Sequence, residues 1–494
     1  MKTTLKRTLA ALLAAFLLLP FAGCAKDTPN TSGNAQTNAG EKTSNAGDKT
    51  ASGDKSGGDA NTEENNEAGD SLENAETEPP YPEPDYSDFV MPEETGELTV
   101  YATDMLGRVM SPAIEIFKEN YPGITVNYKV LDGDEFTTLV GTEIPAGRGP
   151  DLLFCYRYEI PDPFKAMAAG IFTDLNPYFL SDADFTFDDY LREAMDCGVF
   201  RGERLFVPVE VELSVIKSSL EALSDAGIDP DSFTSFESCC ANFLKYHEAY
   251  PDNALVSIWR GDDYLSLLLR TSGMKFIDYE RGKVCVDEGQ LHTLLDVCKA
   301  YHTEKGHPVG PDYIQIGGLF ERMYLGSLGA APFLLLNDMT VIVRGEGETP
   351  FLIPVIDVNG GMTAEIVSYA AIPQGAKNKL NAYRLLRILL SEEIQSGSGR
   401  NGQEYLYLGM PVRKASVTDH ISLAIDDYYA GLPHIEEDGQ MLADYSLSVT
   451  NVSLIPKIIE RYLTLEMMPY VRGEKPWDDC YKRFLNTLEL YASE

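Results

Sequence analysis

Residues 97–130 read ELTVYATDMLGRVMSPAIEIFKENYPGITVNYKV, and this stretch decides the fold. The short apolar, β-rich run Leu98–Ala102 predicts a buried strand. Ser111-Pro112 then opens a helix whose apolar residues roughly share one face, and Pro122-Gly123 ends it. Ile124–Val130 predicts the next strand. A strand, a helix and a strand in this order predict a right-handed crossover between parallel strands.

The same alternation continues along the chain. A helix is predicted at about Glu135–Thr142, and Gly147–Pro150 turns into a strand at Asp151–Phe154. The extended run Leu205–Glu212 contains Pro208, which a central strand is not expected to accept. Further elements are predicted as helices at Ser218–Ala226, Tyr264–Thr271, Gln290–His302 and Leu380–Leu390, strands at Leu255–Trp259 and Ala330–Leu336, and an extended segment at Ser368–Pro373. Strands that recur in mid-chain predict two α/β lobes joined by more than one crossing.

The first residues have the pattern of a secretory signal. Met1–Arg7 is basic and Thr8–Ala22 is apolar, but too short to span a bilayer comfortably. Cys24 directly follows Ala22-Gly23, which resembles the bacterial lipobox. In lipoproteins with that motif, the cysteine becomes the first mature residue and carries lipid. We therefore expect lipidation of Cys24, while a plain signal peptide with a coincidental cysteine is the alternative.

Residues 24–95 are predicted to be a disordered acidic tether. They are rich in Asn, Gly, Thr, Ser and acidic residues and have hardly an aliphatic side chain, so they cannot bury enough apolar surface to offset chain entropy. From Ala25 to Thr95 the chain has 17 acidic and 4 basic residues. A flexible coil of this length has a root-mean-square reach of roughly 45 Å.

Charge and cysteine content narrow the function classes further. The formal net charge of −37 argues against binding nucleic acid or an anionic lipid surface. Seven further cysteines are sparse and make no C-x-x-C pair, so most are predicted to be small buried apolar residues. The vicinal pair Cys239–Cys240 could oxidise, although helix packing is the simpler role.

Several ordered motifs resemble a known family, namely the lipid-anchored extracellular solute-binding proteins of ABC importers, family 1, which includes maltose- and oligosaccharide-binding proteins. The resemblance covers about Glu97 to Glu494. Its motifs are Ala113–Ile124, Ala146–Phe154, Gly170–Pro177, Ala371–Pro373 with the helix and the Ser391–Gln395 segment that follow, and Gly409–Val412.

The resemblance implies a periplasmic-binding-protein-like type II fold, with two α/β lobes around a hinge and the solute held between them. It assigns residues 96–207 and 367–415 to the first lobe, and 208–366 and 416–494 to the second, after a signal peptide at 1–23. The implied protein is a monomer on the extracellular face of the cell membrane. It delivers a solute, with a sugar as first choice, to the permease subunits of an ABC importer.

The site is expected where ligands sit in open α/β sheets, beyond the carboxyl ends of the strands. Sugars need aromatic faces for stacking and carboxylate or guanidinium groups for their hydroxyls. The candidate ligand-binding residues are Asp104, Arg157, Glu210, Glu212, Trp259, Asp263 and Tyr264. By the resemblance, Glu212 matches a hydroxyl-binding carboxylate four residues beyond a proline, and Trp259–Tyr264 matches a loop that supplies an aromatic platform.

Each candidate also has a simpler structural role. Trp259 could belong to the core, and Glu210 and Glu212 could face solvent on a strand edge. Asp104 could cap a helix or stabilise a turn. Arg157 could form a surface ion pair with Glu159 or Asp162.

The ligand class and even the transport role have alternatives. Cys155 stands where the family often has a tryptophan, and Trp259 and Trp477 are the only two tryptophans in the chain. A peptide, a polyamine or an oligomeric osmolyte therefore stays open as the solute. A surface adhesin or a sensor accessory that kept the fold is the alternative outside solute transport.

No catalytic, metal or cofactor motif is present in the sequence. Glu210 and Glu212 lie two apart on one strand and cannot converge across a glycoside. The chain has no G-x-S-x-G, H-E-x-x-H, phosphate-binding or dinucleotide-binding motif. Its six histidines never fall at metal-ligand spacing. The sequence therefore predicts a binding protein without enzyme activity, metal or cofactor.

Overall fold

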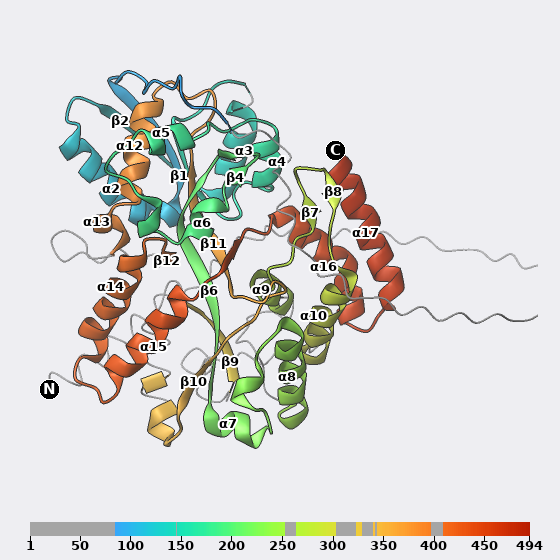
Figure 1. Ribbon diagram of the computed structural model, residues 1–494. Helices are drawn as coiled ribbons and strands as arrows, with labels where there is room; N and C mark the ends of the chain where they lie inside the picture. Colours follow the sequence, from blue (N-terminus) through green and yellow to red (C-terminus); the bar gives the residue numbers. More distant parts are fainter. Residues whose placement is uncertain are drawn as a thin grey trace, which may run out of the picture. The chain divides into compact units, whose positions relative to one another are not determined.

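The computed structural model describes residues 84–144, 146–251, 263–302, 323–328, 339–340, 343–396 and 409–494 (Figure 1). These residues belong to one compact unit that spans Tyr81–Glu494. None of the helices within these ranges is both long and apolar enough to cross a membrane. The predicted signal peptide with Cys24, and the strands predicted at Leu255–Trp259 and Ala330–Leu336, lie outside the described residues.

The first part of the chain folds as the sequence predicts. The strands are β1 (Glu97–Thr103), β2 (Thr125–Leu131) and β3 (Leu152–Tyr156), and the helices between them are α2 (Gly107–Asn120) and α3 (Gly133–Glu143). β1 pairs in parallel with β2 and β3, so that Val100 lies opposite both Tyr128 and Leu152. α2 starts earlier than predicted and contains Pro112, because a 3₁₀ turn at Asp104–Leu106 leads directly into it.

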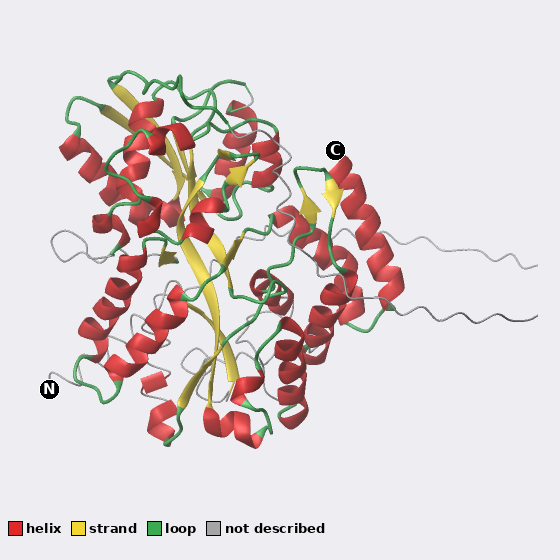
Figure 2. Ribbon diagram, viewed as in Figure 1, coloured by secondary structure: helices red, strands yellow, loops and turns green. Residues whose placement is uncertain are grey.

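The sheet then continues with strands that pair antiparallel, except β13, which pairs in parallel with β11. These strands are β6 (Val207–Ser219), β9 (Met323–Leu328), β10 (Pro350–Ile353), β11 (Thr363–Ala371), β12 (Met410–Pro411) and β13 (Asn451–Ser453). The main order is β10-β6-β11-β3-β1-β2, with β11 antiparallel to both β3 and β6. The 13-residue strand β6 runs from the helices around β1 down to α7 (Leu220–Asp225), as Figures 1 and 2 show. The α/β prediction is confirmed.

One expectation around β6 is wrong, and another differs only in a boundary. Pro208 is the second residue of this central strand, opposite Tyr369 next to a shift in register with β11. On the edge of β6 that faces away from β11, the described pairing begins with Glu210 opposite Pro411 of β12. The missing N–H of Pro208 therefore breaks no described pairing on that edge. The helix predicted from Ser218 begins at Leu220, because β6 extends through Ser219, whose hydroxyl accepts the N–H of Ala222 at 3.0 Å.

Two hydrophobic cores lie along this sheet. The first core is built by β1, β2, β3, α2, α12 (Lys379–Leu389), α14 (Lys414–Ala424) and α15 (Ile435–Leu447), and it includes the fully buried Phe117 and Phe154. The second core is built by α8 (Phe236–Ala249), α9 (Asp263–Thr271), α10 (Glu288–Tyr301), α16 (Lys457–Val471) and α17 (Trp477–Ser493), and it includes Tyr246 and Phe484. The helices predicted at Tyr264–Thr271, Gln290–His302 and Leu380–Leu390 are confirmed as α9, α10 and α12. The predicted lobe boundaries stay a prediction. The helices α14 and α15, which that prediction assigns almost wholly to the second lobe, pack in the first core.

The last residues of the predicted tether differ from the expected disorder. Tyr86 donates its hydroxyl hydrogen to Asp174 at 2.5 Å, and the ring of Phe89 packs edge-on against Tyr178 at 5.0 Å. Arg384 forms an ion pair with Glu94 at 2.6 Å. The few aromatic residues at this end of the segment give it apolar surface to bury, which the upstream Asn- and Gly-rich part lacks.

Candidate functional site

The central group of the candidate site is Arg157, which directly follows β3. Its Nη1 lies 2.6 Å from a carboxylate oxygen of Glu212 on β6 and 2.6 Å from one of Glu365 on β11. The side chains of Arg157 and Glu365 are 8% and 3% exposed, so this pairing is buried, while Glu212 is 19% exposed. The sheet order explains the meeting, because β6, β11 and β3 are successive neighbours.

The pairing extends to the second core through Arg270, at the end of α9. Its Nε lies 3.3 Å from Glu365 and 3.4 Å from Glu460 on α16. Charges therefore alternate along five residues, which we call the charge network: Glu212, Arg157, Glu365, Arg270 and Glu460. Because Glu365 holds one guanidinium from each side, the network connects the strand ends of the first core with the helices of the second.

Two half-buried tyrosines flank the guanidinium groups. The Arg157 guanidinium carbon lies 5.4 Å from the ring centre of Tyr156 and 5.2 Å from that of Tyr158. The corresponding carbon of Arg270 lies 5.3 Å from Tyr158. These distances are within the range of cation–π attraction. The two rings hold the arginines in place and add aromatic surface at the carboxyl end of β3.

Some buried polar atoms of this region have no hydrogen-bond partner among the described residues. They are Nε of Arg157, Oε1 of Glu365 and the hydroxyl of Tyr158. Buried polar groups are usually paired, and each unpaired one is costly. The interior of this region therefore holds one donor, one acceptor and one hydroxyl that are left unpaired among the described residues.

Burial and pairing act on the pKa values of the network in opposite directions. Burial lowers the pKa of Arg157, but Glu365 and Glu212 more than offset this, so its pKa is raised and the guanidinium stays charged. Burial raises the pKa of Glu365 to about 7, and the charges of Arg157 and Arg270 limit the rise. Glu365 therefore titrates near neutral pH between the two guanidiniums.

A further buried carboxylate, that of Glu159, lies next to the strand ends. It accepts the backbone N–H of Tyr156 at 2.7 Å. Its pKa is raised to about 7, chiefly by burial and also by the charge of Asp104, while the nearby Thr103 hydroxyl and the N–H of Tyr156 act the other way. Glu159 therefore titrates near neutral pH at the carboxyl ends of β1 and β3.

The raised pKa of Glu159 predicts a pH-dependent stability. The pKa of Glu159 is about 7 in the folded state and 4.5 in the unfolded state. The protonated carboxyl group therefore stabilises the folded state fully below pH 4.5, and this stabilisation is lost as the pH rises through about 7. Each pKa unit corresponds to about 1.4 kcal/mol, so the loss approaches roughly 3 kcal/mol. Replacing Glu159 by Gln should keep the acceptor for Tyr156 and remove the ionisation.

The check is urea unfolding of wild-type and Glu159→Gln protein between pH 4.5 and 8. The variant should match the wild type at pH 4.5 and exceed it by roughly 2–3 kcal/mol at pH 8. Glu248→Gln, on an exposed position of α8, is the matched control and should leave the wild-type slope unchanged. Parallel curves for wild type and Glu159→Gln would contradict the assignment.

The structure brings two of the predicted site residues together, namely Arg157 and Glu212. The surface pairing of Arg157 with Glu159 or Asp162, considered as an alternative, is wrong, because the side chain is buried and pairs elsewhere. Asp104 is exposed, and its Oδ1 accepts the N–H of Met105 at 2.8 Å, which is the turn role.

The other predicted residues have different positions. Glu210 is completely buried within the sheet, where it accepts the hydroxyl of Ser368 at 2.5 Å and the N–H of Gly409 at 3.3 Å. Its carboxylate thus helps to join β6 to β11 and to the residue before β12. Asp263 and Tyr264 begin α9, and Trp259 lies outside the described residues.

Three members of the network were missed by the sequence analysis. Arg270 lies at the end of a helix, Glu460 lies in another helix, and Glu365 lies in the first half of β11, ahead of the predicted extended segment. Glu365 is 208 residues from Arg157, so no local pattern links the two. The only available signal was a carboxylate inside an otherwise apolar strand, which usually needs a buried partner.

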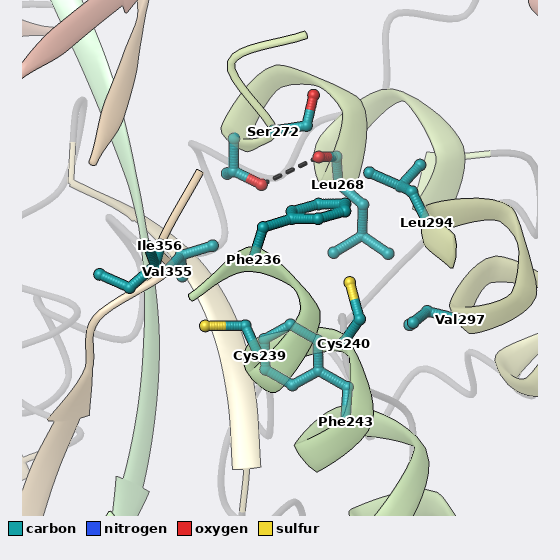
Figure 3. Close-up of a pocket in the computed structure, with 11 residues that line it drawn as sticks. Phe236, Cys239, Cys240, Phe243, Leu268, Ser272, Leu294, Val297, Val355 and Ile356 are labelled. Atoms are coloured by element: carbon teal, nitrogen blue, oxygen red, sulfur yellow. Dashed lines mark hydrogen bonds between the residues drawn. The ribbon is translucent and has the colours of Figure 1, made fainter. Parts of the chain in front are cut away.

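A small apolar cavity lies elsewhere, inside the second core (Figure 3). It lies between α8, α9 and α10 and has a volume of about 20 Å³, which is room for about one water molecule. Its lining includes Phe236, Cys239, Cys240 and Leu268. Solute sites typically have volumes of about 300–1,000 Å³, so this cavity is a packing defect and no solute site.

The cysteines have the structural role that the sequence predicts. All seven downstream of Cys24 are free thiols, and five of them are buried. In Figure 3 the thiols of Cys239 and Cys240 point in different directions from α8. Within the described ranges, no three His, Cys, Asp or Glu residues are arranged to hold a metal ion.

A mixed sheet that supports two hydrophobic cores and is covered by helices defines a two-lobe α/β architecture. Residues 102–396 match the family model described as bacterial extracellular solute-binding protein. Because this match covers more than half of the chain, the protein belongs to this family.

Solved structures show the same fold at low sequence identity. The sugar-binding protein MalE of Xanthomonas citri is 15% identical, with a TM-score of 0.58 over 80% of this chain and 97% of its own. An ABC substrate-binding protein of Listeria monocytogenes, solved in complex with cycloalternan, is 12% identical, with a TM-score of 0.52 over 80% and 99%. A cyclic α-maltosyl-1,6-maltose binding protein of Arthrobacter globiformis is 13% identical, with a TM-score of 0.52 over 80% and 98%. No curated protein matches the sequence significantly.

Proposed function

We propose that this protein is a lipid-anchored extracellular solute-binding protein that captures a mono- or oligosaccharide and delivers it to an ABC importer. The observation that carries the proposal is the charge network, which connects the two cores at the strand ends of a solute-binding fold. A solute placed there would contact groups from both sides and favour the closed form by its differential affinity.

The chemistry of the site supports a hydroxyl-rich solute. Carboxylates accept hydrogen bonds from sugar hydroxyls, a guanidinium donates to sugar oxygens, and tyrosine rings offer faces for stacking. Glu212, Arg157 and Tyr156 provide one group of each kind. The structural relatives support the same class, since they include a sugar-binding protein, a substrate-binding protein in complex with cycloalternan and a cyclic α-maltosyl-1,6-maltose binding protein.

A second candidate is a polyamine or another cationic solute, and the balance of charge favours it. The described carboxylates of the region outnumber its cations: Glu159, Glu212, Glu365 and Glu460 face Arg157, Arg270 and Lys457. Both guanidiniums are already paired with carboxylates. A solute with ammonium groups would therefore meet a favourable field, whereas an anionic solute would be repelled.

A thermal-shift screen tests the proposal and separates the two candidates. The panel should contain neutral mono- and oligosaccharides, polyamines and short peptides. A solute present at 100 times its dissociation constant stabilises the native state by about 2.7 kcal/mol and therefore raises the melting temperature. A shift with sugars alone supports the proposal, a shift with polyamines alone establishes the second candidate, and no shift with any member would favour an adhesin or sensor accessory.

Glu212→Gln tests whether the network contacts the solute found in the screen. Gln keeps the size of the side chain but loses the charge, so a charge-assisted bond to the solute becomes a neutral bond. We expect the affinity to fall about tenfold, which corresponds to about 1.4 kcal/mol. Isothermal titration calorimetry measures this, with Glu248→Gln as the control; equal affinity of both variants would place the solute elsewhere.

A further inference from the structure

A second set of contacts joins the two cores, separate from the charge network, and it centres on Asp162. This residue precedes α4 (Pro163–Ala168) and is 8% exposed. Its Oδ1 accepts the backbone N–H of Lys165 at 3.0 Å, which caps the helix. Its Oδ2 accepts the hydroxyls of Tyr279 at 2.8 Å and Tyr491 at 2.7 Å.

Both tyrosines pack against the second core, and Tyr279 also contacts the first. Tyr279 follows β7 (Ile277–Asp278), whose Ile277 is buried in that core, and Tyr491 lies near the end of α17. Figure 1 shows α4 next to the hairpin of β7 and β8 (Lys283–Val284) and the final turns of α17. One carboxylate oxygen therefore caps a helix beside the first core, and the other accepts one hydroxyl from the second core, that of Tyr491, and one from Tyr279, which lies against both cores.

Neighbouring side chains reinforce these bonds. Lys165 donates to the backbone oxygen of Tyr491 at 2.5 Å, and its ammonium lies 3.7 Å from the centre of the Tyr491 ring. Phe164 stacks on Tyr279 at 5.1 Å with an interplanar angle of 28°. The contact thus combines charge, hydrogen bonds and aromatic packing. Residues 162–165 take part in every one of these interactions.

The hydroxyls are suited to act as donors at all physiological pH values. Burial raises the pKa of Tyr279, and the charge of Asp162 raises it further. The pKa of Tyr491 is raised by burial and by its hydrogen bond to Asp162. Both hydroxyls therefore stay protonated, and hydrogen bonds to an ionised carboxylate are roughly twice as strong as neutral ones.

We propose that Asp162, Tyr279 and Tyr491 form a clasp that holds the two cores together in the solute-free protein. Two-lobe binding proteins exchange between open and closed forms, and any contact made in only one form shifts that equilibrium. The C-terminal helix α17 thereby controls how often the cores separate to admit a solute. The clasp acts independently of which solute binds and of the lipid anchor.

The test is a distance measurement between the cores without added solute. Spin labels are placed at Lys118→Cys on α2 and Glu248→Cys on α8, two exposed positions. The full chain carries Cys24→Ser and Cys285→Ser, because Cys285 is the one exposed cysteine among the described residues. Pulsed electron paramagnetic resonance then compares the parent with the double variant Tyr279→Phe/Tyr491→Phe, which keeps both rings and removes both donors.

We expect the mean distance of the double variant to increase, or its distribution to broaden, by more than about 2 Å. Tyr462→Phe is the matched control, because the Tyr462 ring packs edge-on against Tyr491 at 5.5 Å but its hydroxyl is not bonded to Asp162. Tyr491→Phe alone serves if the double variant does not fold. A distribution identical to that of the parent in the folded variants would overturn the clasp, and an equal change in Tyr462→Phe would reduce it to general packing.

Discussion

Replacing Arg157 by Met is expected to lower the free energy of unfolding by about 3–5 kcal/mol at pH 8, because it leaves buried carboxylates without their main partner. Glu365 is 3% exposed and would keep only Arg270, at 3.3 Å. Met preserves much of the volume and removes the charge. Urea unfolding followed by circular dichroism measures the loss.

The pH dependence separates this cause from a simple loss of packing. Without Arg157 the pKa of Glu365 rises further in the folded state, so protonation relieves the unpaired charge in acid. A carboxyl group whose pKa is raised in the folded state stabilises that state at low pH, and this stabilisation is lost as the pH rises. The deficit of Arg157→Met should therefore be small at pH 5 and largest at pH 8, whereas a cavity would produce the same deficit at both.

Two control variants complete the experiment. Arg192→Met removes an arginine that is 74% exposed and pairs with Asp196 at 3.5 Å, and it should cost less than about 1 kcal/mol. Arg157→Met combined with Glu212→Gln and Glu365→Gln should recover most of the stability, because no buried charge is then left unpaired. A triple variant as unstable as the single one would contradict the explanation.

Local patterns were sufficient for the parallel part of the fold. Leu98–Ala102 and Ile124–Val130 are apolar runs bounded by turn residues, and the helix between them brings the two strands side by side. The same patterns could not place Pro208, because its acceptability depends on which neighbours pair along β6. Pairing in an antiparallel sheet is a tertiary property, and the sequence of one strand does not report it.

Local patterns in the sequence likewise selected only part of the candidate site. The rule that ligands lie beyond strand ends selected Arg157, and a carboxylate after a proline selected Glu212. Their partners Glu365 and Arg270 come from distant segments, and their roles emerge only when β11 and α9 are packed beside β3. Glu210 shows the converse error, since the alternation of polar and apolar residues gave no sign that it is completely buried.

The second large effect concerns attachment to the cell, where Cys24→Ala is expected to release the protein from membranes into the soluble fraction. The acidic segment Ala25–Thr95 supplies no electrostatic attraction to anionic lipid, since it has 17 acidic residues against 4 basic ones. Anchorage would then depend on the acyl chains alone, and stable anchoring needs more than one of them.

Fractionation of cells that express each form measures the effect. The wild type should sediment with membranes in high salt, and the Cys24→Ala variant should not. Cys285→Ala is the matched control, because it removes the exposed cysteine of the described part and leaves Cys24 in place. Persistent membrane association of Cys24→Ala would contradict lipidation. Release with unchanged solute binding would show that the anchor only positions the protein, because the charge network and the clasp both lie in residues that follow the tether.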